Sequence, residues 1–128
     1  MIDHIGVGAS DFAVSRRFYD AALGAIGVDA VIELTPEQTG GYHGVGYGAG
    51  GKPSFWLGSG GARGAGMHIA FAVSARGQVD AFHAAATAAG GRDNGPPGLR
   101  PYYHPDYYAA FVFDPDGTNV EAVCHAPE

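Results

Sequence analysis

Two histidines in matching surroundings are the first residues of this sequence that could do chemistry. Half of the 128-residue chain separates His4 from His68, and an isoleucine follows each of them. The residues two and four positions after each histidine are only Gly or Ala. Because every second residue of a strand lies on the same face, each imidazole is expected to face a space that its neighbours leave open. Imidazoles placed in this way can bind a metal ion or transfer a proton near neutral pH.

Glu121 is the acidic residue that completes this pattern. It lies between Val120 and Ala122 in an apolar segment, and if those two residues face the core, Glu121 points to the same side as the histidines. A carboxylate in such a segment is costly unless it is paired or bound to a metal. Two histidines and one carboxylate form a ligand set that iron, manganese, nickel or zinc accepts. We therefore expect His4, His68 and Glu121 to bind a divalent metal ion. The alternative is an ion pair between Glu121 and Arg92 or Arg100.

Tyrosines crowd into residues 102–108 together with a histidine and an aspartate. A histidine side chain can transfer a proton near neutral pH, and a tyrosine can donate to a developing oxyanion. We expect His104 and Tyr108 to be catalytic and Tyr103 to contact the substrate. The other two tyrosines are expected at a strand edge, with a buried ring and a solvated hydroxyl.

Further aromatic residues lie in the first half of the chain. Either Phe55 or Trp56 is expected to line the same cavity, and an aromatic wall suits a planar ligand. Tyr42, His43 and Tyr47 are expected to form the opposite wall. All five are therefore predicted to bind substrate.

The two halves of the sequence form an internal repeat that predicts how these residues are positioned. The matched positions are His4 and His68, Ser10 and Ser74, Phe18 and Phe82, and Gly27 and Gly91. Two copies are too few for a solenoid. We expect one domain over residues 1–128, made of module one (1–58), a glycine-rich linker (59–66) and module two (67–128).

Each module is expected to follow a βαβββ order. Strands at 2–8 and 67–73 precede helices that begin after Ser10 and Ser74, which are plausible N-caps. The further strands are expected at 28–34, 41–48, 52–58, 91–94, 107–113 and 118–124. The proline-rich stretch 92–105 is expected to be mostly an irregular, functional loop. Asp114-Pro115-Asp116-Gly117 predicts a tight turn between the last two strands.

The repeat, His4, His68 and the ending Asp114-Pro115-Asp116-Gly117-Thr118-Asn119-Val120-Glu121 resemble the vicinal oxygen chelate superfamily. This superfamily includes glyoxalase I, fosfomycin and bleomycin resistance proteins, and extradiol dioxygenases. The resemblance covers essentially the whole chain. It implies an α+β fold, in which two tandem βαβββ modules form an incurved, mostly antiparallel eight-stranded sheet with the helices outside.

The resemblance also implies that metal ligands occur on the first and last strands of each module. These positions are His4, residue 55 or 56, His68 and Glu121. Glyoxalase I would carry a carboxylate at the second position, where this chain has an aromatic residue that cannot bind a metal. The remaining three ligands are similar to those of extradiol dioxygenases, which usually have longer chains.

Composition excludes several classes of function. The net charge is −6 and the chain shows no basic stripe, so nucleic acid is not an expected partner. No apolar run is long enough for a membrane helix. The single cysteine and the absence of an export signal at the start predict a cytoplasmic protein.

Three hypotheses for function follow. The first is a metal-dependent lyase or dioxygenase that binds two neighbouring oxygens of a small molecule through a divalent ion. The second is a metal-free protein that sequesters a small aromatic or cationic compound, as bleomycin resistance proteins do. The third is an interaction module with a filled cavity, which the Gly and Ala residues near the histidines disfavour. The resemblance also implies a possible homodimer.

Overall fold

The computed structural model describes all of residues 1–128 and contains the repeated order of elements that the sequence predicts. Module one contains β1 (Ile5–Gly8), α1 (Phe12–Gly24), β2 (Asp29–Leu34), α2 (Pro36–Thr39), β3 (Gly44–Gly48) and β4 (Phe55–Gly58). Module two contains β5 (His68–Val73), α3 (Arg76–Ala88), β6 (Arg92–Leu99), β7 (Tyr108–Phe113) and β8 (Asn119–Cys124). The short helix α2 is an addition to the predicted pattern. Residues 59–67 contain neither helix nor strand.

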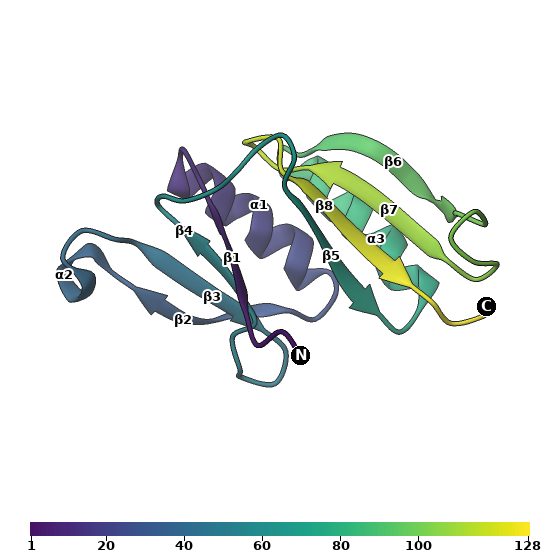
Figure 1. The fold of residues 1–128 in the computed structure, drawn as a ribbon, viewed down its shortest axis with the longest axis horizontal. Coiled ribbons are helices and arrows are strands. Elements are labelled where there is room, and N and C mark those ends of the chain that lie inside the picture. Colours follow the sequence, from purple (N-terminus) through teal and green to yellow (C-terminus); the bar gives the residue numbers. More distant parts are fainter.

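The eight strands are divided between two four-stranded sheets that lie side by side (Figure 1). The strand orders are β1-β4-β3-β2 and β5-β8-β7-β6, so the two sheets have the same topology. In each sheet the first and last strands of the module pair in parallel and the other pairs are antiparallel. The predicted α+β fold with tandem βαβββ modules is thus confirmed.

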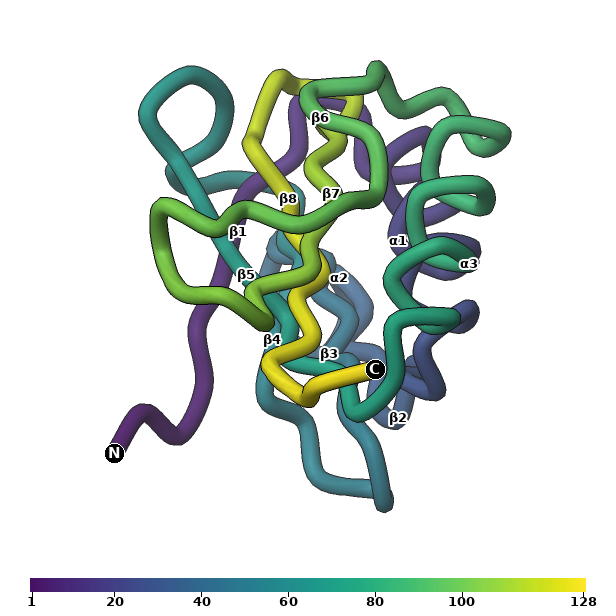
Figure 2. The backbone as a smooth tube through the Cα atoms, turned by 90° about the vertical axis from the view of Figure 1, so that its right-hand side faces the viewer, coloured from purple at the N-terminus to yellow at the C-terminus, as the bar shows by residue number.

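One core lies between the sheets and the two long helices. Figure 2 shows α1 and α3 next to each other on one side of the molecule, with the strands on the other. Phe18 and Leu23 of α1 and Val79 and Phe82 of α3 are fully buried in a cluster of 20 buried residues that draws on both modules. Burying these apolar stripes favours the docking of both helices. None of the helices is both long and apolar enough to cross a membrane.

Asp114, at the start of the predicted turn, connects the two modules. Its side chain is buried and accepts a 2.6 Å hydrogen bond from the Tyr19 hydroxyl of α1. It also accepts backbone hydrogen bonds from Asp116 and Thr118, which hold the turn in place. Gly117 takes a positive φ of 88°, as the turn requires. The carboxylate therefore organises a turn in module two and anchors a helix of module one.

Two local expectations need correction. The N-cap of α1 is Asp11 rather than Ser10, whose backbone and hydroxyl instead donate to Asp116. At α3 the N-cap is Ala75, and the Gln78 side chain accepts from the backbone of Ser74 and Ala75.

The stretch predicted as mostly loop contains strand β6, which extends to Leu99 with two irregularities in register. Pro96 and Pro97 are tolerated there because β6 is an edge strand. On its outer side there is no further strand that would need a hydrogen bond from the missing N–H groups.

We expect Tyr19→Phe to destabilise the protein by about 1–3 kcal/mol, because it leaves the buried Asp114 carboxylate without one of its donors. Urea denaturation followed by circular dichroism measures this change. Tyr102→Phe is the control, since Tyr102 is 75% exposed and should give no change. Equal stability of the two variants would show that the contact between the modules contributes nothing.

Candidate functional site

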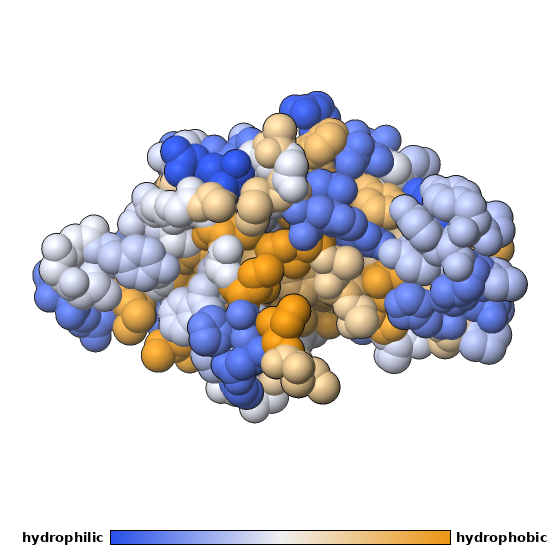
Figure 3. Space-filling model, in the orientation of Figure 1, coloured by the Kyte–Doolittle hydropathy of each residue, from blue (hydrophilic) through white to orange (hydrophobic).

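Each sheet has one face that carries no helix, and both such faces are turned towards the viewer in Figure 1. Figure 3 shows the same side of the molecule, where apolar side chains gather near the middle and polar ones cover the right-hand end. We call these surfaces the open faces of module one and module two. The predicted site residues divide between them.

The open face of module two holds a compact group of three side chains, the His68–Glu121–Tyr107 triad. The Nε2 atom of His68 lies 2.8 Å from Glu121 Oε1, and the Tyr107 hydroxyl donates a 2.5 Å hydrogen bond to Glu121 Oε2. Glu121 is only 1% exposed, whereas the side chain of His68 is 50% exposed. A buried carboxylate thus has a partner on each oxygen, and one partner reaches solvent.

The triad arises from strand register. His68 pairs with Asn119, and two residues along the same strands Ala70 pairs with Glu121. Phe111 of β7 pairs with Glu121 from the other side, and its ring centroid is 6.2 Å from that of His68. The small side chain of Ala70 leaves room beside Glu121. The predicted proximity of His68 and Glu121 therefore holds in the structure.

Tyr107 remains a phenol over an unusually wide range of pH. Burial, together with its hydrogen bond to Glu121 and the negative charge of that carboxylate, raises the pKa of Tyr107 above the ordinary value. It is therefore a stable donor to Glu121.

The tyrosine that contacts Glu121 is Tyr107 and not Tyr108, for which the sequence predicted a catalytic role. Tyr108 faces the helices, where its hydroxyl donates to Asp80 of α3 at 2.7 Å and the Arg76 guanidinium lies over its ring. Tyr107 belongs to the alternate set of positions that includes Phe111, on the open face. Strict alternation along this strand would have identified it.

His104 does not join the triad. Its Nδ1 accepts a hydrogen bond from the Asp106 backbone N–H, so its Nε2 carries the proton and donates to Nδ1 of His125 at 2.8 Å. Tyr103 lies closer to the triad, with its ring centroid 4.6 Å from that of Tyr107. Tyr103 is 61% exposed and is therefore accessible to a ligand.

The open face of module one has Trp56 at the position equivalent to Glu121. Trp56 pairs with Gly6 as Glu121 pairs with Ala70, and each partner lies two residues after the module's histidine. The indole passes so close to Gly46 that a Cβ there would lie 3.1 Å from it. The slot is therefore occupied by an aromatic ring on a glycine floor, and it offers no metal-binding atom.

Tyr42 also lies on this open face. A Cβ at Gly44 or Gly58 would come within 3 Å of its ring or hydroxyl, so the ring lies across that paired glycine position. The Tyr42 side chain is partly exposed. Tyr42 and Trp56 thus form two flat aromatic surfaces over small residues.

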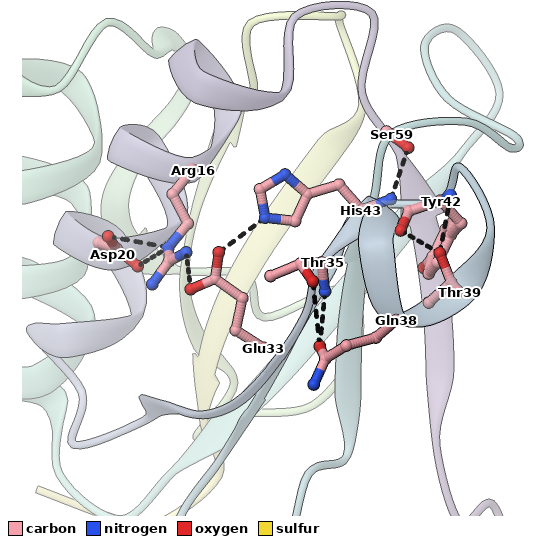
Figure 4. A network of polar contacts seen from close by, with 9 residues as sticks. All are labelled: Arg16, Asp20, Glu33, Thr35, Gln38, Thr39, Tyr42, His43 and Ser59. Carbon is pink, nitrogen blue, oxygen red and sulfur yellow. Dashed lines mark hydrogen bonds and ion pairs between the residues drawn. The ribbon is translucent and has the colours of Figure 1, made fainter.

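Three other predicted wall residues face the helices instead. Phe55 and Tyr47 are buried in the core, where Tyr47 donates to Asp20 at 2.8 Å. His43 stacks on Phe12 of α1 and its Nε2 lies 2.6 Å from Glu33. Figure 4 shows this network, in which Glu33 and Asp20 both bind Arg16. These residues hold β2 and β3 against α1 and do not line an open cavity.

His4 lies apart from the triad. Its side chain is 59% exposed, and its Nδ1 lies 2.8 Å from Asp3, which also pairs with Lys52. Hydrogen bonds from Lys52 and His4 lower the pKa of Asp3 to about 2. The end of β1, rather than its beginning, contacts the segment that leads to β5, through the bond from Gly8 N to Ala62 O. His4 directly precedes β1 and His68 begins β5, and in Figure 1 β1 starts near the lower edge of the molecule whereas β5 starts near the upper edge. No three His, Cys, Asp or Glu side chains of one chain are grouped to hold a metal ion.

Comparisons with known proteins place this chain in a family. The model of the Glyoxalase/Bleomycin resistance protein/Dioxygenase superfamily matches residues 1–122. The chain belongs to this superfamily. A glyoxalase/bleomycin resistance protein from Albidiferax ferrireducens T118 is 33% identical in sequence, with a TM-score of 0.73 and 98% of each chain covered.

Other solved structures share the fold. A glyoxalase-related enzyme from Fulvimarina pelagi is 26% identical, with a TM-score of 0.67 over 97% of this chain and 87% of that chain. Glyoxalase I from Zea mays is 20% identical, with a TM-score of 0.70 over 96% of this chain and 45% of that chain. A search of curated proteins gave no match.

We expect Tyr107→Phe to remove an ionisation from the alkaline end of the tyrosinate absorbance titration. The raised pKa of Tyr107 means that the folded state favours the phenol, so its contribution to stability is complete below the unfolded value near 10 and is lost as pH rises towards the folded value. Denaturation at a series of alkaline pH values should therefore show a smaller loss of stability for Tyr107→Phe than for the wild type. If Tyr107→Phe instead removes tyrosinate absorbance from the low-pH start of the titration, Tyr107 ionises early. The bond to Glu121 then does not hold the phenol proton.

Proposed function

We propose that this protein is a metal-dependent enzyme of the vicinal oxygen chelate type, acting on a small molecule that presents two neighbouring oxygens. The observation that carries the proposal is the His68–Glu121–Tyr107 triad on an open, helix-free face. Glu121 is buried but directed at an exposed imidazole, a placement that contributes little to packing and suits ligand binding. Membership of the superfamily adds support, since its members bind small molecules and often form dimers.

The donor set fits part of a divalent metal site. An imidazole nitrogen and a carboxylate oxygen 2.8 Å apart are separated as two adjacent ligands of one ion would be. Tyr107 binds the second oxygen of Glu121, the kind of outer contact that orients a ligating carboxylate. His68 and Glu121 would therefore hold the ion. When bound, it would supply Lewis-acid stabilisation to a substrate oxygen.

The third predicted ligand, His4, would come from a second copy of the chain. His4 is exposed and lies at the far end of β1 from His68, so it cannot complete the site of its own chain in this arrangement. In a twofold dimer each chain can offer His4 to its partner and receive the partner's His4 in return. The homodimer is thus part of the proposal, with two equivalent sites.

The side chains of this chain would have distinct roles in the reaction. Glu121 has one oxygen held by Tyr107, which would keep its carboxylate oriented to hold the ion together with His68. The Tyr107 phenol, with its raised pKa, keeps its proton and donates a hydrogen bond throughout. Tyr103, whose ring lies beside that of Tyr107, would limit access of water to this side. The aromatic residue in place of a fourth ligand favours a chemistry other than that of glyoxalase I.

Purified protein prepared without chelator should contain about one divalent ion per chain. His4→Ala, His68→Ala and Glu121→Gln should each lower that content severalfold, because each removes one ligand. Elemental analysis after reconstitution with zinc, manganese, iron or nickel measures it. His83→Ala is the matched control. His83 lies on α3, away from the open faces, and pairs with Asp93. Absence of metal in the wild type after reconstitution would contradict the proposal.

Mixing variants tests whether the site spans two chains. The His4→Ala and Glu121→Gln variants, each measured by itself, should bind little metal. After subunit exchange, about one site in four should be intact, because a mixed dimer joins the His4 of one chain to the His68 and Glu121 of the other. No recovery after verified exchange would mean that His4 is not a ligand donated between chains.

A second function is favoured by a different observation, the aromatic open face of module one. The tip of the Trp56 indole lies against Gly46, and the Tyr42 ring lies across Gly44 and Gly58. Aromatic faces of this kind bind planar or cationic compounds through stacking and cation–π contacts. The protein would then sequester a small compound without a metal.

Fluorescence of Trp56, the single tryptophan, distinguishes the two functions. Under the metal-free alternative, a planar cationic dye such as ethidium should quench Trp56 equally with and without chelator, and Tyr42→Ala should weaken binding about tenfold through loss of stacking. Tyr102→Ala is the control for loss of an exposed ring. Quenching that disappears with chelator would favour the metal-dependent enzyme instead.

A further inference from the structure

The open face of module two carries two arginine side chains that form no ion pair with a carboxylate. The chain has 13 acidic and 7 basic residues, so acidic partners are in excess. Four of the basic residues pair with a carboxylate, namely Arg16, Lys52, Arg63 and Arg76. Of the remaining three, Arg92 and Arg100 lie on this one face, and Arg17 lies on α1.

Both arginines stack on phenyl rings of the same strand. The Arg92 guanidinium lies 4.8 Å from the ring centroid of Phe113, and that of Arg100 lies 5.4 Å from that of Phe111. Phe111 and Phe113 share the open face because the residues between and before them, Val112 and Ala110, are buried in the core. The two guanidinium groups are thus neighbours on one ladder of rings.

Arg100 is held in place by uncharged groups. Its Nη1 donates to Gly98 O and its Nη2 to Pro96 O, both at 2.8 Å. Gly95 and Gly98 provide the floor, since a Cβ at either would lie within 3.2 Å of the guanidinium. A guanidinium has five N–H donors, so three remain after these two bonds. The group is oriented and still able to bind a planar anion with two parallel hydrogen bonds.

Arg100 also lies close to the triad. The Phe111 ring lies beneath the Arg100 guanidinium, and its centroid is 6.2 Å from that of the His68 imidazole. Phe111 therefore lies next to both the arginine and the triad. The Arg100 backbone N–H donates to the carbonyl of Tyr107 at 2.7 Å, which links the arginine directly to the residue that holds Glu121. One small molecule can therefore span from the guanidinium to the imidazole.

From this arrangement we infer that Arg100, assisted by Arg92, binds the carboxylate of the substrate. The inference rests on the proposed function for the site and specifies its substrate class, a small carboxylic acid with an apolar body. The carboxylate would bind Arg100, the body would lie along Phe111, and the reacting oxygens would face His68 and Glu121. A local cationic patch of this kind would attract an anion in spite of the negative net charge of the chain.

The test compares mandelate with mandelamide, which have nearly the same shape and differ in charge. Titrations of chelator-treated protein at fixed ionic strength, followed by amide chemical shifts, give both affinities. We expect mandelate to bind at least about tenfold more tightly to the wild type, as a charge-assisted hydrogen bond implies. Arg100→Met should abolish the preference and Arg92→Met should reduce it.

Arg17→Met is the matched control, because it removes the third unpaired arginine from α1 and should keep the full preference. Arg92→Met provides a second test in case Arg100→Met does not fold. Arg92 is exposed, and its side chain makes only the contact with the Phe113 ring. Equal binding of acid and amide to the wild type, no saturable shift with mandelate, or an unchanged preference in Arg100→Met overturns the inference. Because the titration uses metal-free protein, these results leave the metal content of the wild type as a separate test of the proposed function.

Discussion

The arrangement of this molecule depends on the burial of one face of each sheet. Alternate residues of every inner strand join α1 and α3 in a single core, and both helices lie on the same side. Because a strand places successive side chains on opposite faces, the choice of core residues also determines which residues face outward. Glu121 and Trp56 are on the open faces because their neighbours in sequence are needed in the core.

The repeated modules supply the same backbone for two different surfaces. At equivalent positions, module two has Glu121 with hydrogen-bonding partners, and module one has Trp56 over Gly46. Module two therefore offers a polar, charged face and module one an aromatic one. In a dimer these surfaces can be brought together from different chains, so that a ligand meets polar groups on one side and rings on the other.

Much of the fold could be predicted from the sequence because the signals were periodic. The repeat, the alternation around His68 and the turn at Asp114 all depend on local pattern, and the structure has each of them. The proximity of His68 and Glu121 followed from the same alternation. Tyr107 was missed because residue type was weighed above alternation within a tyrosine-rich segment, and the same rule would have assigned Tyr108 to the helix side.

Other features depend on contacts between distant segments that no local pattern reports. His43 and Tyr47 were predicted to line a cavity, but Glu33 and Asp20, from β2 and α1, bind them on the helix side. The position of His4 relative to His68 depends on how two strands run past each other. The strand β6 was hidden by Pro96 and Pro97, which an edge position tolerates.

The glycines beneath Trp56 and Arg100 have a consequence for how this sequence can change over time. A Cβ at Gly46 would lie 2.9 Å from the side chains of Ile32 and Pro53 and 3.1 Å from the indole, and a Cβ at Gly98 would lie 3.2 Å from the Arg100 guanidinium. A larger residue at either floor position becomes acceptable only once the groups around it are smaller or shifted. Related sequences should therefore change at position 46 together with positions 32, 53 and 56, and at position 98 together with position 100, so that each open face diversifies by coordinated substitutions.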